Sequence, residues 1–251
     1  MAVIDDSFRQ TGWQTIGAGA PITRYQVFGE RSSGTNFVKR LIGRNTGLTP
    51  MEELGWKHGF PHMTAIPRDV AVICVVRNAE DWVQSMFSKP WHCPPAMQEM
   101  PFSDFIRAEW DTIADRPRYF PQIETLGGAG APLQLDRHPL TGRRFSNIFD
   151  LRQHKLLGLL GFAMRDCCVT FVRLEAAQAA PESFLQDLSD GLRIPAPHSP
   201  YRPVVKRLGS RFKPSVPSRP DPPATISTED RSFMRASLDL RTEAALGYDY
   251  T

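Results

Sequence analysis

The stretch that decides the fold runs from residue 25 to residue 38 and reads Tyr25-Gln-Val-Phe-Gly-Glu-Arg-Ser-Ser-Gly-Thr-Asn-Phe-Val38. Its apolar start predicts a short strand, its Gly/Ser-rich middle a turn, and its end the beginning of a helix. Gly29 and Gly34 have the G-x-x-x-x-G spacing of a Walker A loop, in which backbone N–H groups and the helix N-terminus hold phosphate oxygens. The stretch therefore predicts a phosphate-binding loop.

The two residues after the loop indicate which kind of nucleotide it suits. A nucleoside-triphosphate enzyme needs Lys followed by Ser or Thr there, because the Lys reaches the β- and γ-phosphates and the hydroxyl binds Mg²⁺. This chain has Thr35 and Asn36 instead. The loop therefore favours a nucleotide whose 5′ end is not a triphosphate.

A second anion-binding element follows downstream. Residues 70–76 form an uninterrupted apolar, mostly β-branched run, which is typical of a strand buried on both faces of a parallel sheet. The run ends in Arg77, and residues 79–87 have helical spacing with Ser85 about two turns in. An Arg at the carboxyl end of a strand and a Ser on the next helix can bind one anion from two sides. The chain thus predicts two phosphate sites, as a nucleotide with a 5′- and a 3′-phosphate would need.

These motifs together resemble the P-loop sulfotransferases, which use 3′-phosphoadenosine 5′-phosphosulfate (PAPS). Residues 33–37 (Ser-Gly-Thr-Asn-Phe) are similar to that family's 5′-phosphosulfate loop, and residues 76–81 with Ser85 are similar to its 3′-phosphate motif. Residues 56–61 (Trp-Lys-His-Gly-Phe-Pro) resemble the segment that carries the family's catalytic His. Weaker likeness continues in residues 169–175, 181–184 and 243–248.

The resemblance implies a fold, a reaction and a set of site residues. The fold would be a three-layer α/β sandwich around a mostly parallel central sheet, like that of the P-loop NTPases. His58 would be the general base, since its unperturbed pKa is near working pH, and Arg31 or Lys57 would stabilise the leaving phosphate without a metal. The residues implied in cofactor binding are Arg31, Ser32, Ser33, Gly34, Thr35, Asn36, Phe37, Arg77 and Ser85.

The chain also departs from the family pattern. Better known members have a Lys directly before the Ser-Gly-Thr of the loop, where this chain has Ser32, and Arg31 is the candidate substitute because its side chain is long and permanently charged. Many members have a Tyr at the position of Leu174. The family's late basic loop has its nearest counterpart in residues 201–209, which carry the further candidate cofactor ligands Arg202, Lys206 and Arg207.

Several alternatives remain open from the residues alone. Phe37 stacks on adenine or packs in the core of the first helix, and His58 is either a base or a structural hydrogen-bonding residue. A divergent P-loop kinase or NTPase is the leading alternative enzyme, and a noncatalytic nucleotide-binding protein is the third class of function. Residues 195–223, rich in proline, are either a lid over the cofactor or a linker.

The organisation predicted is one domain covering residues 1–251, with a cofactor-binding core at 25–87 and an acceptor-side insertion at 88–148. Helices are expected at about residues 35–43, 102–110 and 147–162, the last with Arg152, His154 and Lys155 on its wetter side.

Composition limits the remaining choices. With 251 residues, 41% hydrophobic and 23% charged, the chain can bury a sizeable core. A net charge of +3 is too small to argue for nucleic acid, and we expect no nucleic-acid partner. The four Cys lack zinc-site spacing and predict free thiols in a reducing compartment. With no signal peptide and no membrane span evident, we expect a cytoplasmic protein acting on a small-molecule or saccharide acceptor; neither the acceptor nor the oligomeric state can be chosen.

Overall fold

The computed structural model describes residues 4–17, 19, 21–205 and 211–250. The chain forms two compact units. The first unit comprises residues 1–78, 155–209 and 240–251, and the second comprises residues 79–154 and 210–239. The secondary-structure elements, in chain order, are α1 Asp6–Thr11, β1 Trp13–Ile16, β2 Arg24–Gly29, α2 Thr35–Asn45, β3 Thr49–Pro50, β4 Val70–Val76, α3 Ala79–Ser88, α4 Pro95–Gln98, α5 Phe102–Arg107, α6 Gln122–Leu126, η1 Gln134–Asp136, α7 Ile148–Leu160, η2 Gly161–Met164, β5 Cys168–Arg173, α8 Leu174–Ala179, α9 Pro181–Leu192, α10 Thr228–Ser237 and α11 Leu240–Ala245.

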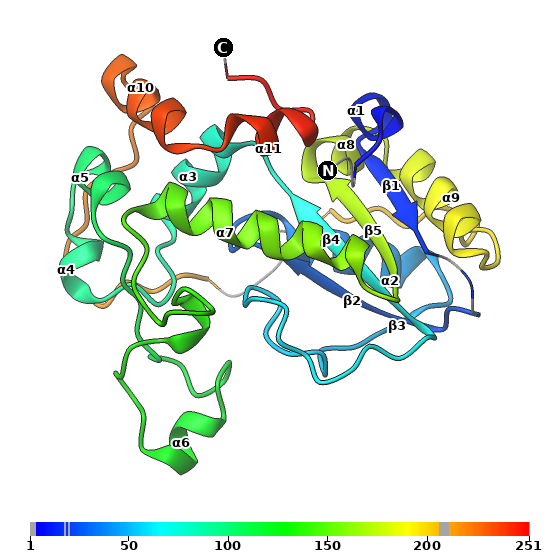
Figure 1. Cartoon of the computed structure of the whole chain (residues 1–251), viewed down its shortest axis with the longest axis horizontal. Helices are drawn as coiled ribbons and strands as arrows, with labels where there is room; N and C mark the ends of the chain where they lie inside the picture. The colour runs from blue at the N-terminus through cyan, green and yellow to red at the C-terminus, as the bar shows by residue number, and fades with distance from the viewer. Residues whose placement is uncertain (1–3, 18, 20, 206–210, 251) are drawn as a thin grey trace. The chain divides into compact units, whose positions relative to one another are not determined.

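The first unit is built on a five-stranded sheet with the order β1-β5-β4-β2-β3 (Figure 1). The contacts β2–β3, β2–β4 and β4–β5 are parallel, and β1 pairs with β5 antiparallel. The register places Gly29 opposite Val75 and Val76 opposite Arg173. The chain is thus an α/β protein with a mixed, mostly parallel sheet flanked by helices. The predicted α/β class and mostly parallel sheet are confirmed.

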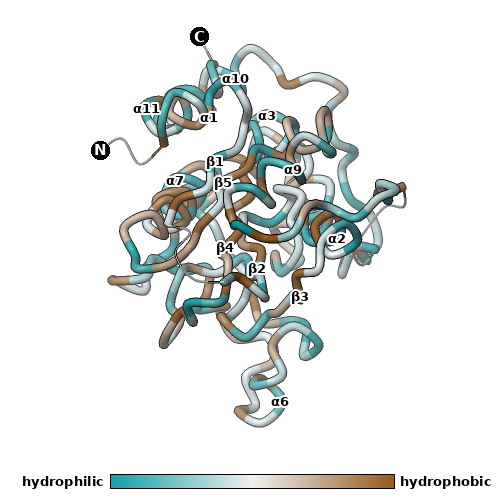
Figure 2. Tube along the Cα trace, turned by 90° about the vertical axis from the view of Figure 1, so that its right-hand side faces the viewer, coloured by the Kyte–Doolittle hydropathy of each residue, from teal (hydrophilic) through white to brown (hydrophobic). Residues whose placement is uncertain are grey.

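Both faces of the sheet are buried, which explains the unbroken apolar run of β4. Every residue of this strand is buried, and its side chains alternate between two apolar clusters. Ala71, Ile73 and Val75 pack on the face covered by α2 and α9, while Val70, Val72, Cys74 and Val76 pack on the face that contacts Phe8 and the end of α7. Figure 2 shows the chain at β4 in brown, the colour of hydrophobic residues.

The predicted elements of the cofactor-binding core are present. The strand at residues 70–76 is β4, and the predicted helix after the loop is α2, which extends to Asn45 rather than ending at Gly43. The last turn continues because the Asn45 side-chain amide donates to the Leu41 carbonyl and the Thr46 N–H donates to the Ile42 carbonyl. These two hydrogen bonds carry the helix past Gly43, where the sequence predicted its end.

The second unit is mainly helical. The helix predicted over residues 102–110 stops at Arg107, because Ala108 is extended and Trp110 forms an isolated bridge with Phe145. Helix α10 is capped by the Ser227 hydroxyl, which accepts the Asp230 N–H. Among the described residues, no helix has the length and apolarity needed to cross a membrane.

The wetter side predicted for residues 147–162 is wrong for two of its three residues. Arg152 is fully buried, with its guanidinium 5.0 Å from the centroid of the Trp82 ring in the second unit. Lys155 is also buried, and its ammonium group lies 4.0 Å from the centroid of the Phe60 ring in the first unit. The long cationic side chains are stabilised by aromatic faces rather than by water.

Candidate active site

The candidate site lies at the carboxyl ends of β2 and β4, two adjacent parallel strands of the first unit. From β2 the chain continues to β3 on one side of the sheet, whereas from β4 it goes on to β5 on the other side. Open α/β sheets commonly bind their ligands outside the carboxyl ends of the strands at such a reversal of strand order. The segments that follow these two strands are the predicted loop and Arg77.

Two glycines allow the loop to turn tightly between β2 and α2. At Gly29 a Cβ atom would lie 2.6 Å from both the Ser33 hydroxyl and the Val75 carbonyl oxygen. Gly34, the N-cap of α2, has φ 90°, and a Cβ there would lie 2.4 Å from Leu174. The buried Ser33 hydroxyl donates to the Glu30 carbonyl at 2.8 Å and closes the turn. Only glycine fits the two ends of this loop.

Arg77 is hydrogen-bonded to the loop. Its guanidinium Nη1 donates to the carbonyl of Ser32 at 3.0 Å. Ser32 is in the left-handed region with φ 65°, a conformation that costs a non-glycine residue about 1–2 kcal/mol. The hydrogen bond therefore joins the end of β4 to the strained centre of the loop.

His58 contacts the same loop from a different segment. Its Nδ1 lies 2.7 Å from the Gly29 carbonyl oxygen, which can only accept, so Nδ1 carries the proton in the neutral ring. Nε2 then holds the lone pair that a general base requires. The Lys57 carbonyl accepts the N–H of Gly29 at 3.0 Å, which secures the segment against the loop.

Cationic side chains surround His58. The Lys57 ammonium donates to the Asn36 side-chain oxygen at 2.7 Å, and the Lys155 ammonium donates to the His58 carbonyl at 2.8 Å. The Arg31 guanidinium lies 5.8 Å from the Trp56 ring, whose centroid is 5.5 Å from that of His58. Loop, base segment and α7 thus bring three positive charges to one part of the first unit.

Burial and these charges set the ionisation of the site. The pKa of His58 is well below its ordinary value, chiefly because burial disfavours the charged ring, with Lys57, Arg31 and Lys155 adding to the effect. The hydrogen bond to Gly29 opposes the shift. Burial also lowers the pKa of Lys57. The site therefore combines a neutral imidazole with cations that an incoming anion would compensate.

The residue after Arg77 is fixed by a carboxylate. Oε1 of Glu175 accepts the backbone N–H of Asn78 at 2.9 Å and its side-chain amide at 2.8 Å. Oε2 of Glu175 accepts the Tyr248 hydroxyl at 3.0 Å. The start of α8 and the closing segment of the chain thereby hold the end of β4 in place.

The structure places the remaining predicted residues as follows. Thr35 is buried at the start of α2, and Phe37 packs against the apolar cluster between the sheet and α9. The backbone of Arg202 is hydrogen-bonded to the Asn45 side chain in the last turn of α2. Asn45 lies nine residues along the helix from Asn36, about 14 Å at ~1.5 Å per residue. The backbone of Arg202 is therefore held at the far end of α2 from the loop.

Three further predicted residues stay predictions. Ser85 lies partly buried on α3 in the second unit, so its pairing with Arg77 remains a prediction. Lys206 and Arg207 lie outside the described residues.

Two residues of the cluster were not predicted from the sequence. Lys155 was assigned to a solvated helix face, and Glu175 had no role beyond its place in a weakly similar segment. Their contacts join positions 97 residues apart, His58 with Lys155 and Asn78 with Glu175, and no local sequence pattern reports such a separation. Within the described residues, no group of three or more His, Cys, Asp or Glu side chains is placed to hold a metal ion.

Comparison with known proteins adds no family assignment: no protein-family model matches the sequence, and the searches of curated proteins and of solved structures return no match.

Proposed function

We propose that this protein is a PAPS-dependent sulfotransferase with a fold of the P-loop type. The observation that carries the proposal is the hydrogen-bonded convergence of three segments, in which Arg77 donates to Ser32 and His58 contacts Gly29. A glycine-bounded loop, a strand-terminal Arg and a neutral His thus meet where a parallel sheet reverses its strand order.

The proposed roles follow from the chemistry of sulfuryl transfer. The acceptor hydroxyl or amine attacks sulfur, the bond from sulfur to the 5′-phosphate oxygen breaks, and 3′-phosphoadenosine 5′-phosphate (PAP) leaves. Nε2 of His58 takes the acceptor proton. Arg31, Lys57 and the N–H groups at the start of α2 offset the charge that develops on the leaving phosphate. No metal is required by this scheme.

Cofactor recognition divides between the loop and the end of β4. In this proposal residues 33–36 bind the 5′-phosphosulfate and Arg77 binds the 3′-phosphate, for which Ser85 is a further candidate ligand. Phe37 is the candidate for adenine stacking, and Arg202, Lys206 and Arg207 stay candidate cofactor ligands. Because Arg77 is bonded to the Ser32 carbonyl, occupation of the 3′-phosphate site would also affect the loop.

The alternative nucleotide enzymes are disfavoured by particular residues. Thr35 stands where a triphosphate enzyme needs Lys, and Arg77 ends the strand that would carry the Walker B Asp. A noncatalytic nucleotide-binding protein would keep the loop and Arg77 without needing His58.

Calorimetric titration tests the cofactor assignment. We expect PAP to bind in metal-free buffer with a Kd in the micromolar range, roughly −8 kcal/mol, and more tightly than ATP with Mg²⁺. Arg77→Ala should weaken binding by about tenfold or more, because a charge-assisted hydrogen bond is worth about 1.5–3 kcal/mol. The matched control Arg68→Ala removes an exposed Arg of the same unit and should have no effect. Tight binding of ATP with Mg²⁺ and none of PAP would exclude the proposal.

A further inference from the structure

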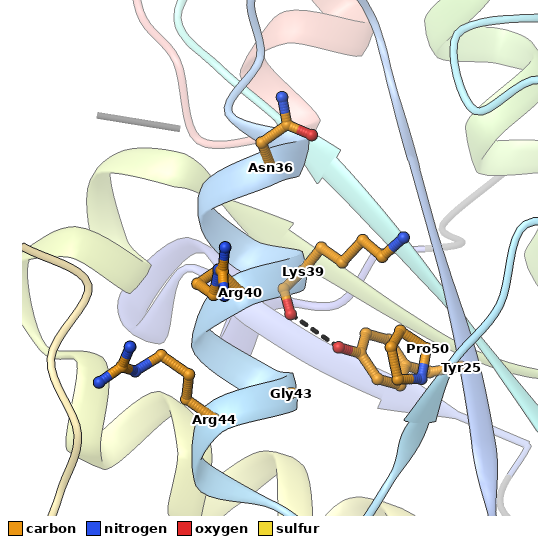
Figure 3. A pocket seen from close by; sticks show the side chains of 7 residues that line it. All are labelled: Tyr25, Asn36, Lys39, Arg40, Gly43, Arg44 and Pro50. Carbon is orange, nitrogen blue, oxygen red and sulfur yellow. Dashed lines mark hydrogen bonds between the residues drawn. The ribbon is translucent and has the colours of Figure 1, made fainter. Parts of the chain in front are cut away.

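A hollow of about 340 Å³ lies along α2, beside β2 and β3 (Figure 3). Lys39, Arg40, Gly43 and Arg44 of α2 line it, together with Tyr25 of β2 and Pro50 of β3. Asn36, at its upper end in Figure 3, also belongs to the predicted cofactor loop, but the rest of the hollow runs toward the opposite end of the helix. It is therefore a separate candidate site.

The base of the hollow is built from buried structure. Tyr25 is fully buried, and its hydroxyl donates to the carbonyl of Lys39 at 2.7 Å. Gly43 lets the helix backbone lie close to this hydroxyl, since a Cβ there would lie 2.8 Å from the Tyr25 oxygen. A hydrogen-bonded Tyr ring and a helix glycine without a Cβ thus lie side by side in the lining of the hollow.

The charges around the hollow are unbalanced. Lys39 is paired with Glu52 at 2.7 Å, but Arg40 and Arg44 form no ion pair within the described part of the chain. They are exposed and lie four positions apart, so their side chains are neighbours about 5–6 Å apart at Cβ and repel each other. An anion between them would relieve that repulsion.

We propose that this hollow is a second anion-binding site, for a compact ligand that carries neighbouring sulfate or phosphate groups. Arg40 and Arg44 engage adjacent oxyanions with their planar guanidinium groups, and Lys39 contributes at the wall beside Pro50. The volume lies at the lower end of the range for small-molecule pockets, about 300–1,000 Å³. Sulfate and phosphate present the same oxyanion geometry, so the test compares the two. The inference does not depend on the proposed transferase activity.

Calorimetry with a matched pair of probes, inositol hexakisphosphate and inositol hexasulfate, tests this site at about 150 mM salt. We expect at least one probe to bind, and Arg40→Gln with Arg44→Gln to weaken it by about tenfold or more. Gln keeps the helix propensity of Arg, and circular dichroism checks that α2 is intact. Arg68→Gln, the exposed-Arg control, should change binding by less than about twofold. Glu52→Gln should strengthen it, because it releases Lys39 from its ion pair.

The two probes and PAP decide the outcome. A preference for one probe names the ligand's anion, and equal binding indicates a general oxyanion site. Saturating PAP should leave probe binding in place. Displacement of the probe by PAP, binding unchanged in the double variant, an equal loss in the Arg68 control, or no binding of either probe would each overturn the inference. Failure of PAP itself to bind would count against the proposed function alone.

Discussion

His58 is a neutral imidazole at neutral pH because desolvation of its part-buried ring and the positive charges of Lys57, Arg31 and Lys155 lower its pKa. In the proposed reaction the lowered pKa has two opposing consequences. The unprotonated ring is fully available as a base, but it binds a proton more weakly than a free His does. The negative phosphosulfate would compensate the cations and raise the pKa of His58 when the cofactor binds. Basicity would then develop only in the complex.

The lowered pKa predicts how stability depends on pH. The unfolded chain takes up a proton at His58 near pH ~6.5, whereas the folded chain does so only at lower pH. The contribution of His58 to the free energy of unfolding is therefore unchanged above that value and falls as pH drops below it, by up to about 1.4 kcal/mol per pH unit. His58→Gln should flatten this fall, measured by urea unfolding at pH ~7.5 and ~5.5. The exposed His62 serves as control: an equal effect of His62→Gln would contradict the assignment.

Arg31 is the candidate substitute for the Lys that the family has at the position of Ser32. If it stabilises the leaving phosphate, Arg31→Met should lower the transfer rate by about 10²-fold or more while changing PAP affinity much less, since the lost interaction belongs to the transition state. Adding Ser32→Lys to this variant should recover part of the rate. Equal losses in rate and affinity would instead place Arg31 in ground-state binding.

At the scale of elements, the loop between β2 and α2 is packed against the start of α8 through Gly34 and Leu174. Gly34→Ala should destabilise the protein by about 2 kcal/mol or more, from a strained backbone and overlap with Leu174. Urea unfolding measures the effect. Gly47→Ala is the control, because a Cβ there meets nothing within 4 Å, and it should change stability by less than about 0.5 kcal/mol.

A double-mutant cycle separates the two causes. Leu174→Ala removes the overlap but not the strain at Gly34, so the pair of substitutions should destabilise less than the sum of the single ones, by about 1 kcal/mol. Additive effects would show that overlap with Leu174 is not what excludes a side chain at Gly34.

Glu175 links three elements, since it accepts hydrogen bonds from Asn78 at the end of β4 and from Tyr248 near the chain end. Glu175→Ala leaves the Asn78 donors without this acceptor and should cost about 1–3 kcal/mol. Tyr248→Phe removes one hydrogen bond and should cost about 1 kcal/mol. PAP titration should show weaker binding for Glu175→Ala because Arg77 precedes Asn78. If affinity is unchanged while stability falls, Glu175 is structural only.

Elements with strong local signals could be predicted, and those defined by distant contacts could not. Residues 70–76 were predicted as a strand because a run of seven apolar residues is typical of a strand buried on both faces of a parallel sheet. In contrast, β1 is four residues long and half-buried, and β3 has two residues. Both are strands only because β5 and β2 supply their hydrogen-bond partners.

Over the whole molecule, the sequence predicted the α/β class and a mostly parallel sheet, and the structure confirms both. It did not predict the cluster around His58 in full, because Lys155 comes from a helix whose periodicity suggested solvent exposure. The burial of Arg152 and Lys155 depends on Trp82 and Phe60, whose positions only the folded chain defines.

The central claim is that the cluster around His58 transfers sulfuryl groups, and the most direct measurement is transfer from radiolabelled PAPS to pooled phenol, saccharide and amine acceptors in metal-free buffer. The account predicts labelled product with the natural protein and with His62→Ala, and a loss of about 10²–10⁴-fold with His58→Ala, the usual contribution of a general base. PAP binding should survive in all three proteins. Labelled product formed equally well by His58→Ala, or PAP binding with no transfer to any acceptor, would contradict it.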